Sequence, residues 1–226
     1  MPLPLLLGHR GVRRVKSVLE NTPQAFDSAL SQGCDGFEFD VRLSGDGQPV
    51  VCHDARVDGK EIAACSFEEL GLPLFREVLQ RYRKRAFLDI ELKEAGLESP
   101  IVDLLSLFPP VKGYVISSFI PEVLEKVHGL NARATLGLIC ETPSQFAEWP
   151  RLPVQYVIVH YKLAQRPVIE RLNAEDCKVL VWTVNSAADM MRFARWNVDG
   201  IISDHPAKLV GTLRKKSFDA EQAPKN

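Results

Sequence analysis

The chain of 226 residues is 46% hydrophobic and 25% charged, which is typical of a globular domain and excludes collagen-like, low-complexity and disordered chains. Its 28 basic and 29 acidic residues give a net charge of −1, so bulk charge offers no reason to expect nucleic acid or an anionic membrane as partner. No stretch free of Asp, Glu, Lys and Arg exceeds ten residues, whereas a membrane-spanning helix needs about 20 apolar positions.

The cysteines and the amino terminus indicate a reducing compartment. Five cysteines, at positions 34, 52, 65, 140 and 177, include no CxxC pair, so neither a disulfide framework nor a zinc site is predicted. The apolar run that opens the chain lacks a basic region before it and is interrupted by Pro4, which favours a first strand over a signal peptide. We therefore expect a cytoplasmic protein.

Eight short apolar runs recur along the chain, each followed by a segment of helical spacing. In chain order they cover residues 5–8, 36–41, 86–93, 113–119, 135–141, 156–162, 178–185 and 199–204. From the third run onward their starts lie 27, 22, 21, 22 and 21 residues apart, the length of one strand and one helix. The pattern predicts a (β/α)8 TIM barrel, because the rival doubly wound sheet would carry a glycine-rich phosphate turn and neither GxGxxG nor GxxxxGK[ST] occurs.

The interval between the second and third runs is longer than the others. It spans 50 residues from start to start and holds a glycine-rich turn at 44–47 and an added extended piece at 49–54. We predict a short insertion after strand 2, a position where functional residues concentrate. The barrel domain is placed at residues 1–213, and residues 214–226 are expected to form a flexible polar tail.

Charged residues alternate along two neighbouring predicted strands. In the sequence Phe-Glu-Phe-Asp-Val at 37–41, Glu38 and Asp40 fall on one face, and Glu91 and Lys93 share a face near the end of the next strand. A barrel strand has no solvated face, so three carboxylates in one space favour a hard cation such as Mg²⁺ or Ca²⁺. Lys93 could pair with Glu91 or hold an anionic substrate.

Two histidines follow predicted strands at the same end of the barrel. His9 comes directly after the first strand, and His53 ends the added extended piece. Such a pair is what a reaction needs when one proton is removed and another is delivered. Arg10 supplies a forked cation suited to a phosphate or a carboxylate.

Eight motifs in order resemble the pattern of the glycerophosphodiester phosphodiesterases. They are His-Arg-Gly at 9–11, Glu-Asn-Thr at 20–22, Glu-Phe-Asp-Val at 38–41, His-Asp at 53–54, Glu-Leu-Lys at 91–93, Ser-Ser-Phe at 117–119, Trp-Thr-Val-Asn at 182–185 and Asp-Gly-Ile-Ile-Ser-Asp-His-Pro at 199–206. The resemblance implies a barrel enzyme with one catalytic divalent cation and a pair of acid/base histidines. Its substrates would be small glycerophosphodiesters, and its products sn-glycerol 3-phosphate and an alcohol.

The resemblance also implies a role for each matching residue. It makes His9 and His53 the catalytic pair. The implied metal ligands are Glu38, Asp40 and Glu91, the phosphate contacts Arg10 and Lys93, and the aromatic walls of the substrate site Phe119 and Trp182. In supporting roles, Glu20 would orient glycerol or the metal ligands, and Asp54 would fix the His53 tautomer.

The chain departs from the family pattern beside the expected site. Residues 55–70 replace what is usually a longer insertion, and Leu19 stands where proline often precedes Glu-Asn-Thr. We expect the side of the site that receives the alcohol to be open and to discriminate little between head groups.

Two other functions fit the same motifs: a lyase related to phospholipase C or sphingomyelinase D that leaves a cyclic phosphate, and a catalytically silent phosphodiester-binding barrel.

Overall fold

A computed structural model describes residues 3–13 and 17–221 and contains a closed barrel of eight parallel strands. The barrel strands are β1 (Leu5–Gly8), β2 (Gly36–Leu43), β6 (Phe87–Leu92), β7 (Tyr114–Ser118), β8 (Leu136–Cys140), β9 (Tyr156–His160), β10 (Lys178–Trp182) and β11 (Gly200–Ser203). Each pairs with its neighbour in this order, and β1 also pairs with β11, which closes the ring. The predicted (β/α)8 barrel and its eight strands are confirmed.

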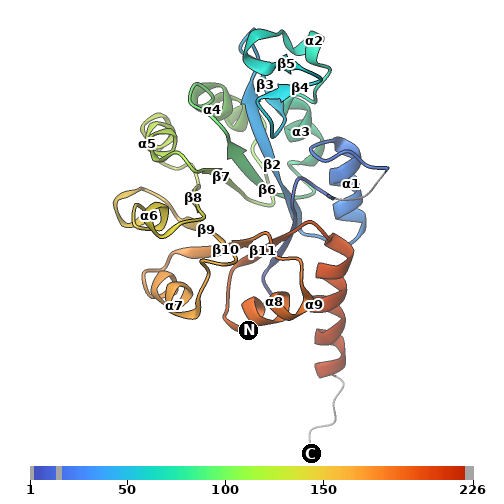
Figure 1. Ribbon diagram of the computed structural model, residues 1–226, viewed down its shortest axis with the longest axis vertical. Coiled ribbons are helices and arrows are strands. Elements are labelled where there is room, and N and C mark those ends of the chain that lie inside the picture. The colour runs from blue at the N-terminus through green and yellow to red at the C-terminus, as the bar shows by residue number, and fades with distance from the viewer. Residues whose placement is uncertain (1–2, 14–16, 222–226) are drawn as a thin grey trace, which may run out of the picture.

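Helices follow the strands and form the outer ring (Figure 1). They are α1 (Pro23–Ser31), α3 (Phe75–Tyr82), α4 (Glu98–Leu107), α5 (Pro121–Leu130), α6 (Pro143–Phe146), α7 (Arg166–Ala174), α8 (Ala187–Arg195) and α9 (Pro206–Glu221). Prolines occupy the first turn of α1, α5, α6 and α7, where a missing N–H costs least. Helix α9 continues to Glu221, so residues 214–221 of the expected tail are helical, and residues 222–226 lie outside the described part of the chain.

The alternation along β2 separates the core from the site. Phe37 and Phe39 are fully buried outside the barrel against α1, where the Phe37 ring stacks on Phe26 with 4.1 Å between centroids. Consecutive strand residues point to opposite faces, so Glu38 and Asp40 point into the barrel. The packing that fixes β2 therefore also aims its two carboxylates.

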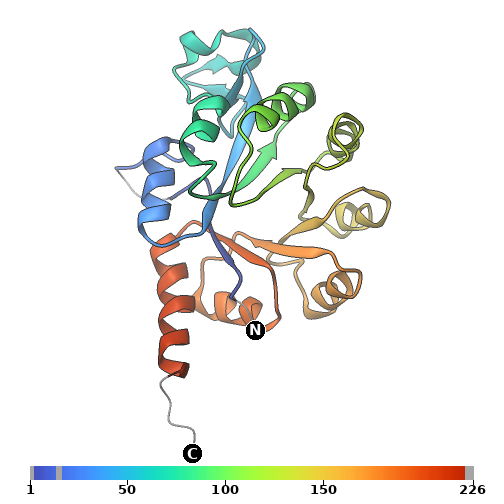
Figure 2. The same cartoon turned by 180° about the vertical axis from the view of Figure 1, so that it is seen from behind.

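The insertion after β2 lies at one end of the molecule, beyond the barrel, in both views (Figures 1 and 2). Strand β3 (Pro49–Val51) pairs antiparallel with the end of β2, and β4 (Arg56–Val57) pairs with β5 (Lys60–Glu61). A 3₁₀ turn, η1 (Ile62–Ala64), and helix α2 (Phe67–Leu70) complete it, and a second 3₁₀ turn, η2 (Trp149–Arg151), follows α6. Residues 55–70 thus form a small folded unit next to the barrel mouth.

The structure bears on two further sequence-based expectations. All five cysteines are free thiols. Within residues 3–13 and 17–221, no helix combines the length and apolar character that crossing a bilayer requires.

Candidate active site

Three carboxylates from two adjacent strands meet at the barrel mouth. The register of β2 and β6 sets Asp40 beside Glu91, with Glu38 two residues earlier on the same face. One oxygen from each of Glu38, Asp40 and Glu91 lies within 4.8 Å of the others, and all three side chains are buried. The predicted ligand set is therefore brought together.

Hydrogen bonds and neighbouring cations offset the negative charge of these three carboxylates only in part. Glu38 Oε1 and Asp40 Oδ1 are buried and accept no hydrogen bond. Burial, together with the neighbouring carboxylates, raises the pKa of Glu38 well above its usual range and that of Glu91 to about 7. Burial acts on Asp40 in the same direction, but Lys93 and Arg10 outweigh it and lower the pKa of Asp40. Carboxylate oxygens that accept no hydrogen bond in a low-dielectric cavity are what a hard cation would satisfy.

Two cations border the carboxylates. The Arg10 backbone N–H donates to Glu38 Oε2 at 2.9 Å, and its guanidinium donates to Glu20 at 2.5 Å and lies 3.2 Å from Asp40. Lys93 Nζ lies 2.5 Å from Glu91 Oε1 and 3.3 Å from Asp40 Oδ1. Both cations line the cavity that also holds the carboxylates, where a phosphate could exchange for these ion pairs.

His9 is held in place by a carboxylate from the far end of the chain. Its Nδ1 donates to Asp204 Oδ1 at 2.7 Å, and its Nε2 lies 3.8 Å from Glu38 Oε2. The Asp204 carboxylate also accepts a 2.7 Å hydrogen bond from Asn185, and although burial opposes it, these partners lower the pKa of Asp204 to about 2. An ionised Asp204 fixes the tautomer of His9 and leaves Nε2 facing the cavity.

His53 reaches the same cavity from the insertion. Its Nδ1 donates to Asp54 Oδ1 at 2.7 Å, and this hydrogen bond lowers the pKa of Asp54. The Asp54 side chain is 78% exposed, in contrast to the 3% of Asp204. The two histidines therefore share one arrangement, but only the partner of His9 is buried.

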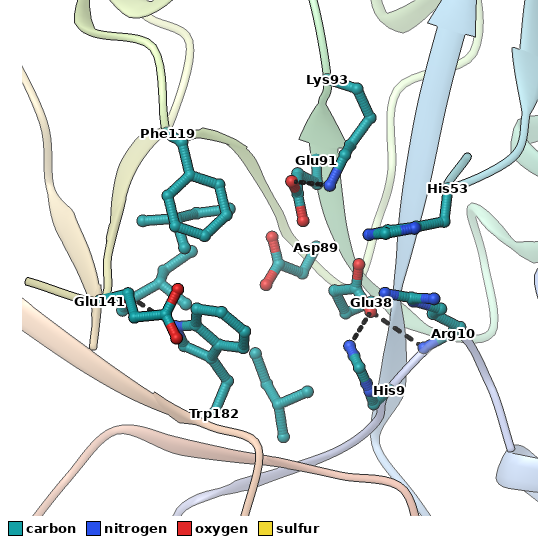
Figure 3. Close-up of a pocket in the computed structure, with 13 residues that line it drawn as sticks. His9, Arg10, Glu38, His53, Asp89, Glu91, Lys93, Phe119, Glu141 and Trp182 are labelled. Atoms are coloured by element: carbon teal, nitrogen blue, oxygen red, sulfur yellow. Dashed lines mark hydrogen bonds and ion pairs between the residues drawn. The ribbon is translucent and has the colours of Figure 1, made fainter. Parts of the chain in front are cut away.

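A cavity of about 250 Å³ joins these groups to an apolar wall. Phe119 and Trp182 form the aromatic part of the wall, with an edge-to-face contact of 5.7 Å between centroids. Figure 3 shows both rings across the carboxylates from His53 and Arg10. Asp89 lies at the centre of the cavity with its Oδ2 buried and unpartnered, and burial raises its pKa to about 7.

Eight of the eleven predicted site residues line this cavity, and three do not. The lining set includes His9, Arg10, Glu38, His53, Glu91, Lys93, Phe119 and Trp182. Asp40 lies in the carboxylate cluster, whereas Glu20 and Asp54 line a neighbouring cavity and reach the site only through Arg10 and His53.

Sequence reasoning missed the functions of three polar residues. Asn21 donates to Asp40 Oδ2 at 2.8 Å, Ser117 donates to Asp89 at 2.6 Å, and Asp204 holds His9. A carboxylate at the end of the last strand was a usable signal for Asp204, because barrel closure sets that strand beside the first one.

Comparisons with known proteins identify a family model and several relatives that are similar to this chain. The model of the glycerophosphoryl diester phosphodiesterase family matches residues 9–96 and 102–208. A glycerophosphodiester phosphodiesterase from Caldanaerobacter subterraneus subsp. tengcongensis is 28% identical over 93% of this chain and 98% of its own length. One from Bacillus altitudinis is 26% identical over 91% and 96%.

Solved structures of similar proteins have the same fold. A glycerophosphodiester phosphodiesterase from Thermotoga maritima superposes with a TM-score of 0.80 at 25% identity, covering 93% of this chain and 98% of that one. An Oleispira antarctica phosphodiesterase in complex with the product sn-glycerol-3-phosphate superposes with a TM-score of 0.82 at 24% identity, covering 94% and 97%.

Proposed function

The chain belongs to the glycerophosphoryl diester phosphodiesterase family, and we propose that it hydrolyses glycerophosphodiesters to sn-glycerol 3-phosphate and an alcohol, using one divalent cation and two acid/base histidines. The glycerophosphodiesterase activity follows from the family and from the relatives named for it. The Oleispira antarctica phosphodiesterase, which holds sn-glycerol-3-phosphate as its product, supports the choice of product here. The cation and the histidine chemistry rest on this chain's own residues.

The observation that carries the proposal is the buried carboxylate cluster. Glu38 Oε1 and Asp40 Oδ1 lack hydrogen bonds, and Glu91 lies close enough to share one ion with them. An all-oxygen donor set suits Mg²⁺ or Ca²⁺ rather than a softer metal. Bound there, the cation would act as a Lewis acid on the phosphoryl oxygens.

The residues around the cluster then have distinct tasks. Arg10 and Lys93 bind the anionic phosphate and offset the charge that develops on its oxygens. His9 and His53 present Nε2 to the cavity, so one accepts the proton of the attacking nucleophile and the other donates a proton to the leaving oxygen. Phe119 and Trp182 pack against the glycerol carbons and exclude water from that side.

A metal-binding experiment tests the ligand set apart from turnover. We expect the wild-type protein to bind one Mg²⁺ or Ca²⁺ in calorimetric titration after chelation and dialysis, and Glu38→Gln/Asp40→Asn to lose that binding. Glu98→Gln is the matched control, since Glu98 is also buried but lies outside the cluster. Unchanged affinity in the double variant, or full turnover by protein stripped of metal, would refute the proposed cation site.

Product analysis separates hydrolysis from the lyase alternative. Phosphorus NMR of a glycerophosphocholine reaction should reveal sn-glycerol 3-phosphate as the final product. A persistent cyclic phosphate would support the lyase, and an absence of turnover with bound substrate would support the silent binding barrel.

A further inference from the structure

A second cavity adjoins the site on the side of His53. It has a volume of about 310 Å³ and lies between the first loop, the insertion and the segment before α3. His53 lines both this side cavity and the catalytic one. Glu20 also lines the side cavity and accepts a hydrogen bond from Arg10. The two cavities therefore share a wall at one of the proposed acid/base groups.

The position of the side cavity matches the alcohol arm of a phosphodiester. Phe119 and Trp182 wall the catalytic cavity on the side opposite His53 (Figure 3). The glycerol and alcohol oxygens are different corners of one tetrahedral phosphorus, so the two arms of the substrate diverge from the phosphate. If glycerol packs against the two rings, the second arm of the substrate leaves the phosphate toward His53 and the side cavity.

The wall of the side cavity is largely apolar. Leu19, Val57, Leu72 and Pro73 contribute to it, and Leu19 is 73% exposed, so an apolar ligand could cover a large hydrophobic surface there. Val57 belongs to the segment 55–70, which we expected to leave the alcohol side uncovered. The short insertion instead folds into part of a wall.

The charged residues on this wall are already paired with protein groups. Glu20 binds Arg10 and Arg13, Asp54 binds His53, and Arg56 lies 3.3 Å from Glu61. These pairs leave the apolar surface as the main basis for selecting a ligand. A charged head group would gain little from such a wall.

We propose that the side cavity is the alcohol subsite and that it selects alcohols with an uncharged, apolar body of a few carbon atoms. The inference rests on the proposed function and adds the class of leaving group. Because the contacts lie away from the reacting atoms, they should lower KM more than they raise kcat.

A homologous substrate series provides the test. The substrates are the methanol, ethanol, butanol and hexanol esters of glycerophosphate. We expect kcat/KM of the metal-loaded protein to rise about twofold per methylene, which corresponds to half of the free energy that full burial of a methylene contributes. Leu19→Ser should flatten this rise. Leu107→Ser is the matched control, because Leu107 is 67% exposed at the end of α4 and does not line the side cavity.

A pair of isosteres tests the role of charge. Choline and 3,3-dimethylbutanol have nearly the same shape, but only choline is charged, and we expect the neutral ester to be at least as good a substrate. A flat series in the wild type, or a tenfold preference for choline, would overturn the inference and leave the proposed function intact. No turnover of any ester with metal present would overturn both.

Discussion

At the scale of single residues, the two histidines differ in how firmly they are held. Asp204 is buried and is itself held by Asn185, whereas water can reach Asp54 and take its place. A buried carboxylate that orients a histidine contributes more than an exposed one, because no solvent molecule can replace its hydrogen bond. The environment of each histidine therefore predicts how sensitive it is to loss of its partner.

Removing either histidine should nearly abolish turnover. We expect His9→Ala and His53→Ala each to lower kcat about 100-fold or more, because a positioned proton transfer contributes about 10² to 10⁴. The double variant should fall well short of the product of the two losses, since the groups act on one transition state. Steady-state kinetics, with melting temperatures as a folding control, provide the measurement; a histidine whose alanine variant keeps wild-type kcat has no part in the mechanism.

Variants of Asp204 and Asp54, the carboxylates that hold the two histidines, should differ clearly in kcat. Asp204→Asn is expected to lower kcat about 10- to 100-fold, and Asp54→Asn less than about tenfold. Equal losses in the two variants would mean that burial of the partner is not what holds these histidines.

At the scale of elements, the site depends on how closely β2 approaches β6. Gly36 begins β2, and a Cβ atom there would lie 1.9 Å from the carbonyl oxygen of Phe87. Only glycine permits this approach, which sets Glu38 beside Asp89 and Asp40 beside Glu91, two and four residues further along β2. The metal cluster is thus a consequence of strand packing.

The substitution Gly36→Ala should therefore damage fold and site together. We expect a loss of about 2 kcal/mol or more in the free energy of unfolding, from the backbone shift that relieves the clash, and weaker binding of Mg²⁺ or Ca²⁺. Gly129→Ala is the matched control: Gly129 lies in α5 with open space around it, so alanine should stabilise the helix by about 0.5–1 kcal/mol. Urea unfolding and calorimetric titration measure both effects, and unchanged metal affinity in Gly36→Ala would contradict the argument.

Local patterns were sufficient to predict the elements and most of the cluster. The alternation of Glu38 and Asp40 with phenylalanines, and the regular spacing of the apolar runs, depend on neighbours in the chain. The contact between His9 and Asp204 joins residues 195 positions apart and exists only once the ring has closed, so no local pattern reveals it. The side cavity was missed for a related reason: its wall combines the first loop, the insertion and the segment before α3.

At the scale of the whole molecule, the barrel interior collects buried carboxylates from β2 and β6 in one low-dielectric space. Asp89 and Glu91 each have a pKa raised to about 7, chiefly by burial, and that of Glu38 is raised as well. Without a bound cation, ionising these groups costs folding free energy. Stability, pH and metal binding should therefore be linked.

The direction in which stability changes with pH follows from the raised pKa values of Asp89 and Glu91. The folded protein holds these protons more tightly than the unfolded chain, so their contribution to stability is complete below pH 4 and is lost as the pH rises to about 7. For Asp89, a pKa raised from 3.8 to about 7 corresponds to about 4 kcal/mol at most. Asp204, with a pKa near 2, loses its stabilising contribution only below about pH 4, so it does not obscure this window.

We therefore predict that metal-free protein loses stability between pH 4.5 and 7 and that a divalent cation removes most of this loss, because the bound ion favours the ionised carboxylates. The difference in melting temperature between protein with excess Mg²⁺ or Ca²⁺ and protein with chelator should grow as the pH rises through this range.

Asp89→Asn should make the melting temperature of the metal-free protein depend less on pH and should still bind the cation, since Asp89 lies outside the ligand cluster. Glu38→Gln/Asp40→Asn should lose the cation effect at every pH. If the cation raised the melting temperature equally at pH 5 and pH 8, the carboxylates would not be the groups that couple metal binding to folding.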